Sequence, residues 1–282
     1  MLFKVSNPFF PNEKITLRNL ATHTSGIIDK SPVYDSCYHF GEDSPEDLGE
    51  FLKNYFSPQG KYYSKDNFLN ARPGSRNNYS NIGAGLAGYI IEVATGEKLN
   101  LYSKRNIFEP LGMLNTGWFL SEVNLKNHSK LYSESGDSVK SIQLYGLTTY
   151  PDGGVRTSVS DLSKFFICLL NDGELEGKRI LNKESVREMK RPQFNETTKP
   201  DSIDLTKENE GLFWSIENST RVGHSGGDPG VMTNMEYDIS KNLGVILFLN
   251  TMPKEADKAF ASFDNELWDF ALKLKYGLPT SR

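Results

Sequence analysis

The sequence has 282 residues, 37% of them hydrophobic and 24% charged, with 32 basic and 36 acidic side chains and a formal net charge of −4. This apolar content is sufficient for a hydrophobic core and argues against wholesale disorder. The slightly acidic balance lacks the basic surface typical of nucleic-acid-binding proteins, so we expect no nucleic-acid partner.

Neither a membrane segment nor an export signal is predicted. No stretch approaches the roughly 18 consecutive apolar residues that a spanning helix needs. The opening residues, MLFKVSNPFFPNEK, lack the apolar core of a signal peptide and are interrupted at Asn7 and Pro8. The sequence specifies neither a localisation nor an oligomeric state.

The first two thirds of the chain read as helices and loops. Apolar spacing and end signals predict helices over residues 16–22, 44–56, 82–94, 161–170 and 183–190. Ser44 is the expected cap of the second helix, because Pro45 follows it at the first helical turn. The helix over 82–94 is rich in glycine and alanine, which lowers helix propensity and predicts another segment packed very close to its first two turns.

The last third has a different pattern. Strands are predicted over residues 212–216, 220–223, 231–237 and 243–250. A strongly amphipathic helix over 256–274 follows them. Consecutive strands followed by a helix predict an α+β fold, with an antiparallel sheet flanked by helices and a mostly helical lobe beside it. We expect a single domain over 1–282, with the lobe at about 1–210 and the sheet and last helix at about 211–276.

Metal and nucleotide sites are not indicated. The histidines are scattered, and Cys37 and Cys168 lie far apart, so no metal-ligand spacing or disulfide framework is present. Glycines at 83, 85 and 88 fit a Gly-x-Gly-x-x-Gly string, but a polar loop precedes them where a dinucleotide site requires a buried strand. We therefore expect no metal and no cofactor.

A second glycine-rich string, GHSGG at 223–227, matches the nucleophile elbow Gly-x-Ser-x-Gly. An elbow requires a helix directly after the serine and a histidine later in the chain. Ser225 is followed by another predicted strand and by no histidine, so we reject that interpretation. A strand with small side chains instead lets backbone N–H groups approach a substrate carbonyl, as an oxyanion hole requires.

The tripeptide Tyr79-Ser80-Asn81 stands at the start of the glycine-rich helix. Tyr79 and Asn81, two residues apart at a helix entrance, can both point into one cleft. A tyrosine whose proton is drawn off by a neighbouring cation can act as a general base. Taken alone, the tripeptide is more typical of an ordinary helix cap, Asn81, after a packing tyrosine.

Taken together, these segments resemble the serine β-lactamase and penicillin-binding-protein family, in particular its class C-like esterase and D-amino-peptidase branch. THTSG at 22–26 looks like a signature of that family, and YSNIGAGLAGYIIEVATGE at 79–97 is similar to its Tyr-x-Asn element and following helix. PLGM at 110–113 and PDGGVRTSVSDL at 151–162 resemble further segments in the same order. GHSGGDPGV at 223–231 resembles the last catalytic strand, where His-x-Gly can replace Lys-Thr-Gly.

The resemblance implies a role for each matching residue. Tyr79 would be the general base beside the nucleophile, and Asn81 would hold a substrate amide or a catalytic lysine. His224 stands where the family places a cation that orients Tyr79 and a substrate carboxylate. The N–H of Gly227 would be an oxyanion-hole donor. The strand edge that lines a small-molecule or peptide substrate would comprise Ser225 and Gly226. His23, within THTSG, is assigned to structure.

The family nucleophile lies in a Ser-x-x-Lys motif upstream of THTSG, and no serine of this sequence has lysine three residues later. We therefore expect an N-terminally truncated serine hydrolase that lacks the family's first strands and its nucleophile helix and is inactive alone. Two alternatives remain open: a non-catalytic descendant that binds a ligand or partner, and catalysis by another residue such as Ser225.

Overall fold

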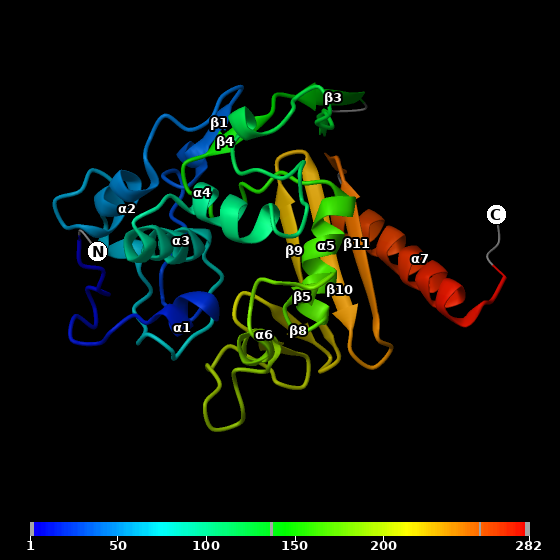
Figure 1. Ribbon diagram of the computed structural model, residues 1–282. Helices are drawn as coiled ribbons and strands as arrows, with labels where there is room; N and C mark the ends of the chain where they lie inside the picture. The colour runs from blue at the N-terminus through cyan, green and yellow to red at the C-terminus, as the bar shows by residue number, and fades with distance from the viewer. Residues whose placement is uncertain (1–2, 136–137, 254, 280–282) are drawn as a thin grey trace.

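The computed structural model describes residues 3–135, 138–253 and 255–279 (Figure 1). Its largest sheet is antiparallel, with the strand order β11-β10-β9-β8-β7. These strands are β7 Glu208–Glu210, β8 Ser215–Glu217, β9 Arg221–Asp228, β10 Val231–Asp238 and β11 Leu243–Leu249. Helix α5, Val159–Leu170, covers one face, and helix α7, Ala256–Tyr276, covers the other. The α+β prediction is thus confirmed.

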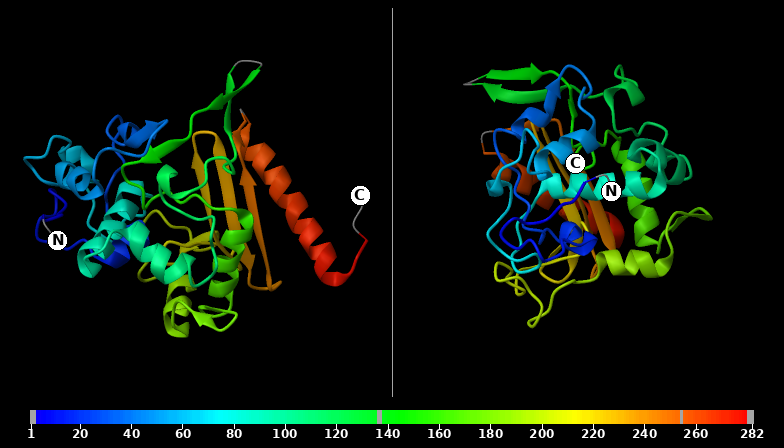
Figure 2. Two further views of the ribbon diagram at one scale, coloured as in Figure 1. Left: turned by 45° about the horizontal axis from the view of Figure 1, so that its top comes forward. Right: turned by 90° about the vertical axis from the view of Figure 1, so that its left-hand side faces the viewer.

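Helices of the N-terminal half form a lobe beside this sheet (Figure 2). They are α1 Leu17–Ala21, α2 Leu48–Phe56, α3 Asn81–Thr95 and α4 Leu99–Ser103, with single turns at Asp35–Cys37, Lys65–Asn67, Lys104–Phe108 and Leu120–Glu122. The apolar faces of α2 and α3 meet in the largest hydrophobic cluster, which includes the fully buried Leu52, Tyr55 and Ile82. Helix α6, Lys183–Lys190, contributes Val186 to a second cluster against the sheet.

Several short strands were not predicted. β1 Tyr38–Phe40 pairs with β4 Tyr145–Leu147, and β5 Glu174–Leu175 pairs with β6 Lys178–Arg179. β2 Leu131–Ser135 lies between β3 Ser138–Ile142 and β12 Thr251–Met252. Each of these strands has only two to five residues, which gives little alternation to recognise. The β1–β4 and β2–β12 partners also lie more than a hundred residues apart in the sequence.

Two predicted boundaries were wrong for identifiable reasons. Helix α2 begins at Leu48, because the Asp47 side chain accepts the N–H groups of Gly49 and Glu50 and is therefore its cap. The Ser44 hydroxyl instead closes a turn with the N–H of Glu46. Strand β9 continues through the whole GHSGGD stretch to Asp228, because β10 pairs with it along its full length.

The glycines of α3 do face a close neighbour, as the sequence predicted. A Cβ atom at Gly88 would lie 2.4 Å from the Cβ of Pro151, and one at Gly85 would lie 3.5 Å from the Cβ of Thr149. The segment over 149–151 therefore approaches the helix backbone itself. This contact fixes the loop that leads to Asp152 relative to the start of α3.

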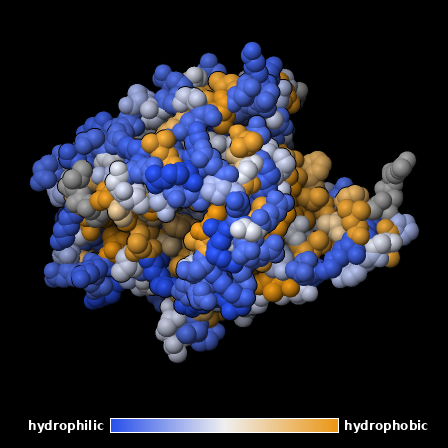
Figure 3. All heavy atoms as spheres, viewed as in Figure 1, coloured by the Kyte–Doolittle hydropathy of each residue, from blue (hydrophilic) through white to orange (hydrophobic). Residues whose placement is uncertain are grey.

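The outer edge of the sheet is apolar. β11, with the sequence LGVILFL, is the last strand of the sheet order, and no other described strand pairs with its free side. Phe263, Phe270 and Leu274 on α7 are 54%, 47% and 62% exposed, and Figure 3 shows hydrophobic side chains along this helix. Among the described residues, no helix is both long and apolar enough to cross a membrane.

Candidate active site

Tyr79 stands where three segments of the chain meet. Its ring stacks on that of His23, with centroids 4.2 Å apart and an interplanar angle of 27°. His224 of β9 lies beyond it, with ring centroids 6.2 Å apart. The structure therefore brings together the THTSG segment, the YSN turn and the GHSGG strand, which lie far apart in the sequence.

The start of α3 is held by Asp29, a residue that sequence reasoning missed. Its carboxylate accepts the hydroxyl of Ser80 at 2.9 Å and the N–H groups of Asn81 and Ile82 at 2.7 and 2.9 Å. The Ser80 hydroxyl also caps the N–H of Gly83 at 2.9 Å. A carboxylate at a helix N-terminus is favoured by the helix dipole, so these bonds fix the turn that carries Tyr79.

The Asn81 side chain hydrogen-bonds no other residue in the described part of the chain. The same holds for the hydroxyl of Tyr79, a residue that is 53% exposed as a whole. Both groups of the predicted Tyr-x-Asn element are thus available to a further group.

β9 presents a free edge beside Tyr79. β8 pairs only with the stretch 221–223, so residues 224–228 have no described strand partner on that side. Ser225, Gly226 and Gly227 are exposed there. Because side chains alternate along a strand, Ser225 lies on the opposite face from His224, level with Asn234, which bonds Asp264 of α7. Ser225 can therefore meet a ligand on the Tyr79 side only through its backbone.

Two tyrosine–carboxylate hydrogen bonds lie at the end of β9. The Tyr38 hydroxyl donates to Asp228 at 2.5 Å, and the Tyr34 hydroxyl donates to Asp152 at 3.3 Å. The Asp228 carboxylate also lies against Gly153, where an added Cβ would be 3.1 Å from its Oδ2. The end of β9 and the segments over 34–38 and 152–153 thus meet around two carboxylates.

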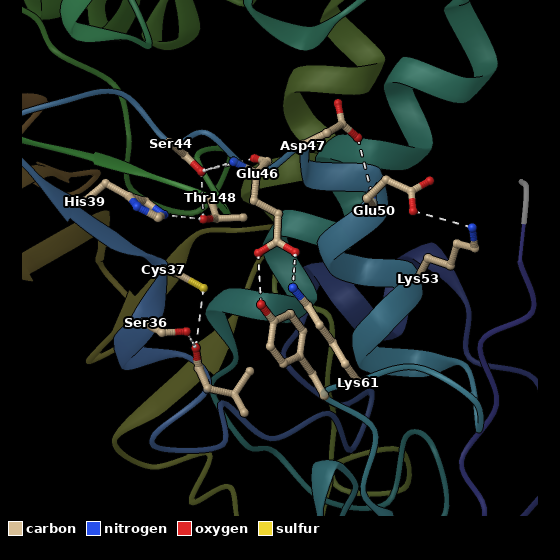
Figure 4. Close-up of polar contacts among 12 residues, drawn as sticks. Ser36, Cys37, His39, Ser44, Glu46, Asp47, Glu50, Lys53, Lys61 and Thr148 are labelled. Carbon is tan, nitrogen blue, oxygen red and sulfur yellow. Dashed lines mark hydrogen bonds and ion pairs between the residues drawn. The ribbon is translucent and has the colours of Figure 1, made fainter.

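The segment over 36–47, which includes Tyr38, is held by further polar contacts (Figure 4). The Thr148 hydroxyl lies 2.8 Å from His39 Nε2 and 2.8 Å from the Ser44 hydroxyl. Glu46 binds Lys61 at 3.2 Å and accepts the Tyr62 hydroxyl at 3.2 Å. These bonds join the segment over 36–47 to Thr148, which directly follows β4, and to the loop after α2. The contacts of Ser44, Thr148 and His39 therefore have a structural role.

Electrostatics keep Tyr79 protonated. Burial, and then the negative charges of Asp152, Asp29, Asp228 and Glu210, raise the pKa of Tyr79 to about 12. Burial also raises the pKa of Asp152 well above its ordinary value. A general base in this position requires a nearby cation to lower its pKa, and the neighbouring carboxylates have the opposite effect.

The two histidines do not supply that cation at neutral pH. Burial, and then the proximity of His224, lower the pKa of His23 to about 4. Burial also lowers the pKa of His224, although its Nδ1 lies 2.5 Å from the carbonyl oxygen of Ser225. Both rings are therefore neutral at pH 7, and Tyr79 beside them is a neutral phenol.

Each predicted site residue has a definite place. Tyr79 lies beside His224, with ring centroids 6.2 Å apart, and Asn81 is the first residue of α3. Ser225, Gly226 and Gly227 follow His224 on the exposed strand edge. The residues missed by sequence reasoning are Asp29, Tyr34, Tyr38, Asp152 and Asp228. No local pattern marks them, because each acts on a partner from another segment.

An antiparallel sheet with helices on both faces, whose exposed strand edge faces a Tyr-x-Asn turn, defines the β-lactamase and transpeptidase-like class of proteins. The chain belongs to the β-lactamase family, whose family model, described as Beta-lactamase, matches residues 7–264. The sequence is 29% identical over 282 residues to Penicillin-binding protein 4* of Bacillus subtilis, with 90% of this chain covered. The chain spans only 54% of the length of that relative.

Solved structures agree on the fold. A penicillin-binding protein from Bacillus halodurans superposes with a TM-score of 0.66 at 22% identity, covering 93% of this chain and 74% of that one. D-amino acid amidase from Ochrobactrum anthropi, in complex with L-phenylalanine amide, superposes with a TM-score of 0.68 at 22% identity, covering 98% and 77%. The predicted transpeptidase-like fold is thus confirmed.

Proposed function

We propose that residues 1–282 form the larger part of the active site of a serine hydrolase that forms an acyl-enzyme. The substrate class is an ester, amide, lactam or D-amino-acid peptide. The nucleophile, within a Ser-x-x-Lys segment, would come from outside these residues. The observation that carries the proposal is that Tyr79, just before α3, lies beside His224 at the free edge of β9, with ring centroids 6.2 Å apart.

The charge of the cleft supports a missing lysine. Burial, and then the carboxylates of Asp152, Asp29 and Asp228, raise the pKa of Tyr79, and both neighbouring imidazoles are neutral at pH 7. A lysine ammonium beside Asn81 would offset this negative potential and lower the pKa of Tyr79 from about 12 toward the working range of a base. The cleft therefore has the electrostatics expected of a site that accepts a cation from another segment.

The proposed reaction follows the family scheme. The phenolate of Tyr79 takes the proton of the serine hydroxyl while the serine oxygen bonds to the substrate carbonyl carbon. The N–H of Gly227 stabilises the resulting oxyanion. Tyr79 then returns the proton to the leaving group as the carbon–leaving-group bond breaks. Water hydrolyses the acyl-enzyme by the same sequence, which restores the serine.

Two exposed apolar surfaces support the proposal that a further segment of the protein packs against the sheet. The free side of β11 and the stripe of Phe263, Phe270 and Leu274 on α7 are hydrophobic and uncovered by described residues. An exposed hydrophobic edge strand favours aggregation and is normally covered in native proteins. A strand and a helix from outside residues 1–282 would bury both.

Intact-mass labelling tests the proposal. The chain of 282 residues is incubated with a fluorophosphonate and separately with a penicillin, and we expect no stoichiometric adduct. A labelled residue within 1–282 would refute the absence of a nucleophile. The DNA upstream of Met1 is then read in frame, and any longer chain that carries Ser-x-x-Lys is expressed and labelled.

The outcome for the longer chain separates the two interpretations. Labelling at its serine, slowed by Tyr79→Phe, supports the hydrolase. An in-frame stop codon, or a longer chain without the serine, would contradict it and favour a non-catalytic descendant that binds a ligand or partner.

A further inference from the structure

His23 adopts a backbone conformation that residues other than glycine rarely use. Its φ is +51°, in the left-handed region, and its side chain is 5% exposed. Such a conformation is energetically unfavourable for a residue with a side chain and persists only where the surrounding structure holds it. Strain of this kind, next to the predicted base, calls for an explanation beyond ordinary packing.

The His23 ring is enclosed by aromatic side chains. Tyr79 stacks on it at 4.2 Å, and Phe213 meets it edge-on at 5.9 Å. Phe213 also has a positive φ, +57°, and its N–H donates to the carbonyl oxygen of Ala21 at 2.7 Å. The ring therefore has little freedom to tilt, and Tyr79 rests on a fixed surface.

His23 also bonds the backbone on both sides of Tyr79. Its carbonyl oxygen accepts the N–H of Asn78 at 2.7 Å, and its Nδ1 accepts the N–H of Ser80 at 3.2 Å. Because Nδ1 accepts, the proton of the neutral ring is on Nε2. One residue thus holds the position of Tyr79 through its ring and through both flanking peptides.

We propose that His23 is the positioning residue of Tyr79, with its ring setting the plane of the phenol and its Nδ1 and carbonyl oxygen fixing the turn that aims it toward His224. The left-handed backbone of His23 allows the carbonyl oxygen and Nδ1 to reach the same turn. That His23 fixes the position of Tyr79 does not depend on the proposed function. That this position matters for catalysis rests on the proposed function, in which Tyr79 is the base.

The test follows the signal of Tyr79 directly. The 282-residue chain is labelled with 3-fluorotyrosine, and among the signals of its 13 tyrosines the one lost in Tyr79→Phe is assigned to Tyr79. In His23→Ala we expect this signal to shift and broaden, because the stacking ring is lost. The control His128→Ala removes a histidine outside the site and leaves the signal unchanged.

Two further variants separate the ring from the hydrogen bonds. Asparagine tolerates a positive φ and offers a side-chain oxygen, so His23→Asn keeps the hydrogen-exchange protection of the Ser80 amide while the fluorine shift changes. His23→Phe keeps a stacking ring but loses the acceptor, so the Ser80 amide exchanges faster. If His23→Ala does not fold, these two variants still decide the question. An unchanged Tyr79 signal in any folded variant that lacks the ring would overturn the proposal.

The role of His23 in positioning Tyr79 and the role of Tyr79 as the base can be tested separately. In a longer chain that carries the nucleophile, misplacement of the base by about 1 Å would lower the acylation rate on the order of 10²-fold. Suppose the Tyr79 signal shifts as expected but acylation by His23→Ala is as fast as that of the wild type. Then His23 does position Tyr79, and the assignment of Tyr79 as the base is what fails.

Discussion

Alanine substitutions at Gly85 and Gly88 of α3 are expected to have opposite effects on stability. A Cβ at Gly85 would lie 3.5 Å from the Cβ of Thr149, which is ordinary van der Waals contact. Alanine gains about 0.5–1 kcal/mol over glycine inside a helix, and a buried methyl adds about 0.8 kcal/mol. Gly85→Ala should therefore raise the free energy of unfolding by about 1–2 kcal/mol.

At Gly88 the added methyl has no room. Its Cβ would lie 2.4 and 2.6 Å from the Cβ and Cγ of Pro151, so the rigid proline ring or the helix must shift by about 1 Å. Overpacking of this kind costs about 1–3 kcal/mol, which exceeds the gain in helix propensity. We expect Gly88→Ala to lower the free energy of unfolding by about 1–2 kcal/mol.

Urea unfolding of both variants and the wild type, with unchanged slopes, measures the difference in stability directly. The Gly85→Ala variant is the matched control, because it changes the same residue type in the same buried helix. If Gly88→Ala stabilised the protein as much as Gly85→Ala, the close approach of Pro151 to the helix backbone would be refuted. Close packing by the segment over 149–151 would then no longer explain the glycine-rich start of α3.

Three further predictions concern the site. The two carboxylate oxygens of Asp29 accept three hydrogen bonds, and Asp29→Asn leaves only one acceptor oxygen. The free energy of unfolding measured in urea should therefore fall by about 1.5–3 kcal/mol. The control Asp66→Asn, at an exposed position, should leave it unchanged. Burial raises the pKa of Glu210 from 4.5 to about 7, so the folded state binds more protons than the unfolded state between these pH values. The free energy of unfolding of the wild type should therefore fall as pH rises from about 4.5 to about 7 and then level off. The Glu210→Gln variant should lack that fall. In a longer chain that carries the nucleophile, Tyr79→Phe should slow fluorophosphonate labelling by about 10²–10⁴-fold, and equal rates would refute its role as base.

The secondary structure was predictable where its signals are local. Ser80 caps α3 through the N–H of Gly83, and Gly96 ends the helix in the left-handed conformation, so both ends are encoded within the helix segment. Likewise β10 and β11 are joined by a short turn, which makes their pairing a local event. By contrast, β1 pairs with β4 across more than a hundred residues, and no pattern within either segment specifies that partner.

The same distinction applies to the site. Tyr79, Asn81 and His224 were predicted because they belong to strings that resemble a family, although nothing within those strings shows which other segments lie beside them. Asp29 acts on the N–H of Ile82, 53 residues away, and Tyr38 acts on Asp228, 190 residues away. The acidic character of the cleft is therefore a tertiary property that single-sequence reasoning cannot supply.

That acidic character leads to a prediction that separates catalysis from simple binding. Burial raises the pKa of Asp228 and the charge of Arg156 partly offsets this effect, while the Arg156 guanidinium donates to the carbonyl oxygens of Gly154 at 2.9 Å and of Tyr145. Burial and the neighbouring carboxylates still raise the pKa of Tyr79 to about 12, so a base in this position requires a further cation. If that cation is a lysine beside a serine nucleophile, the pKa of Tyr79 falls as the site becomes complete, and labelling rises with it. If instead it belongs to a bound ligand, Tyr79 stays protonated in the longest natural chain, and ligand affinity rises as the Asp152 carboxyl ionises.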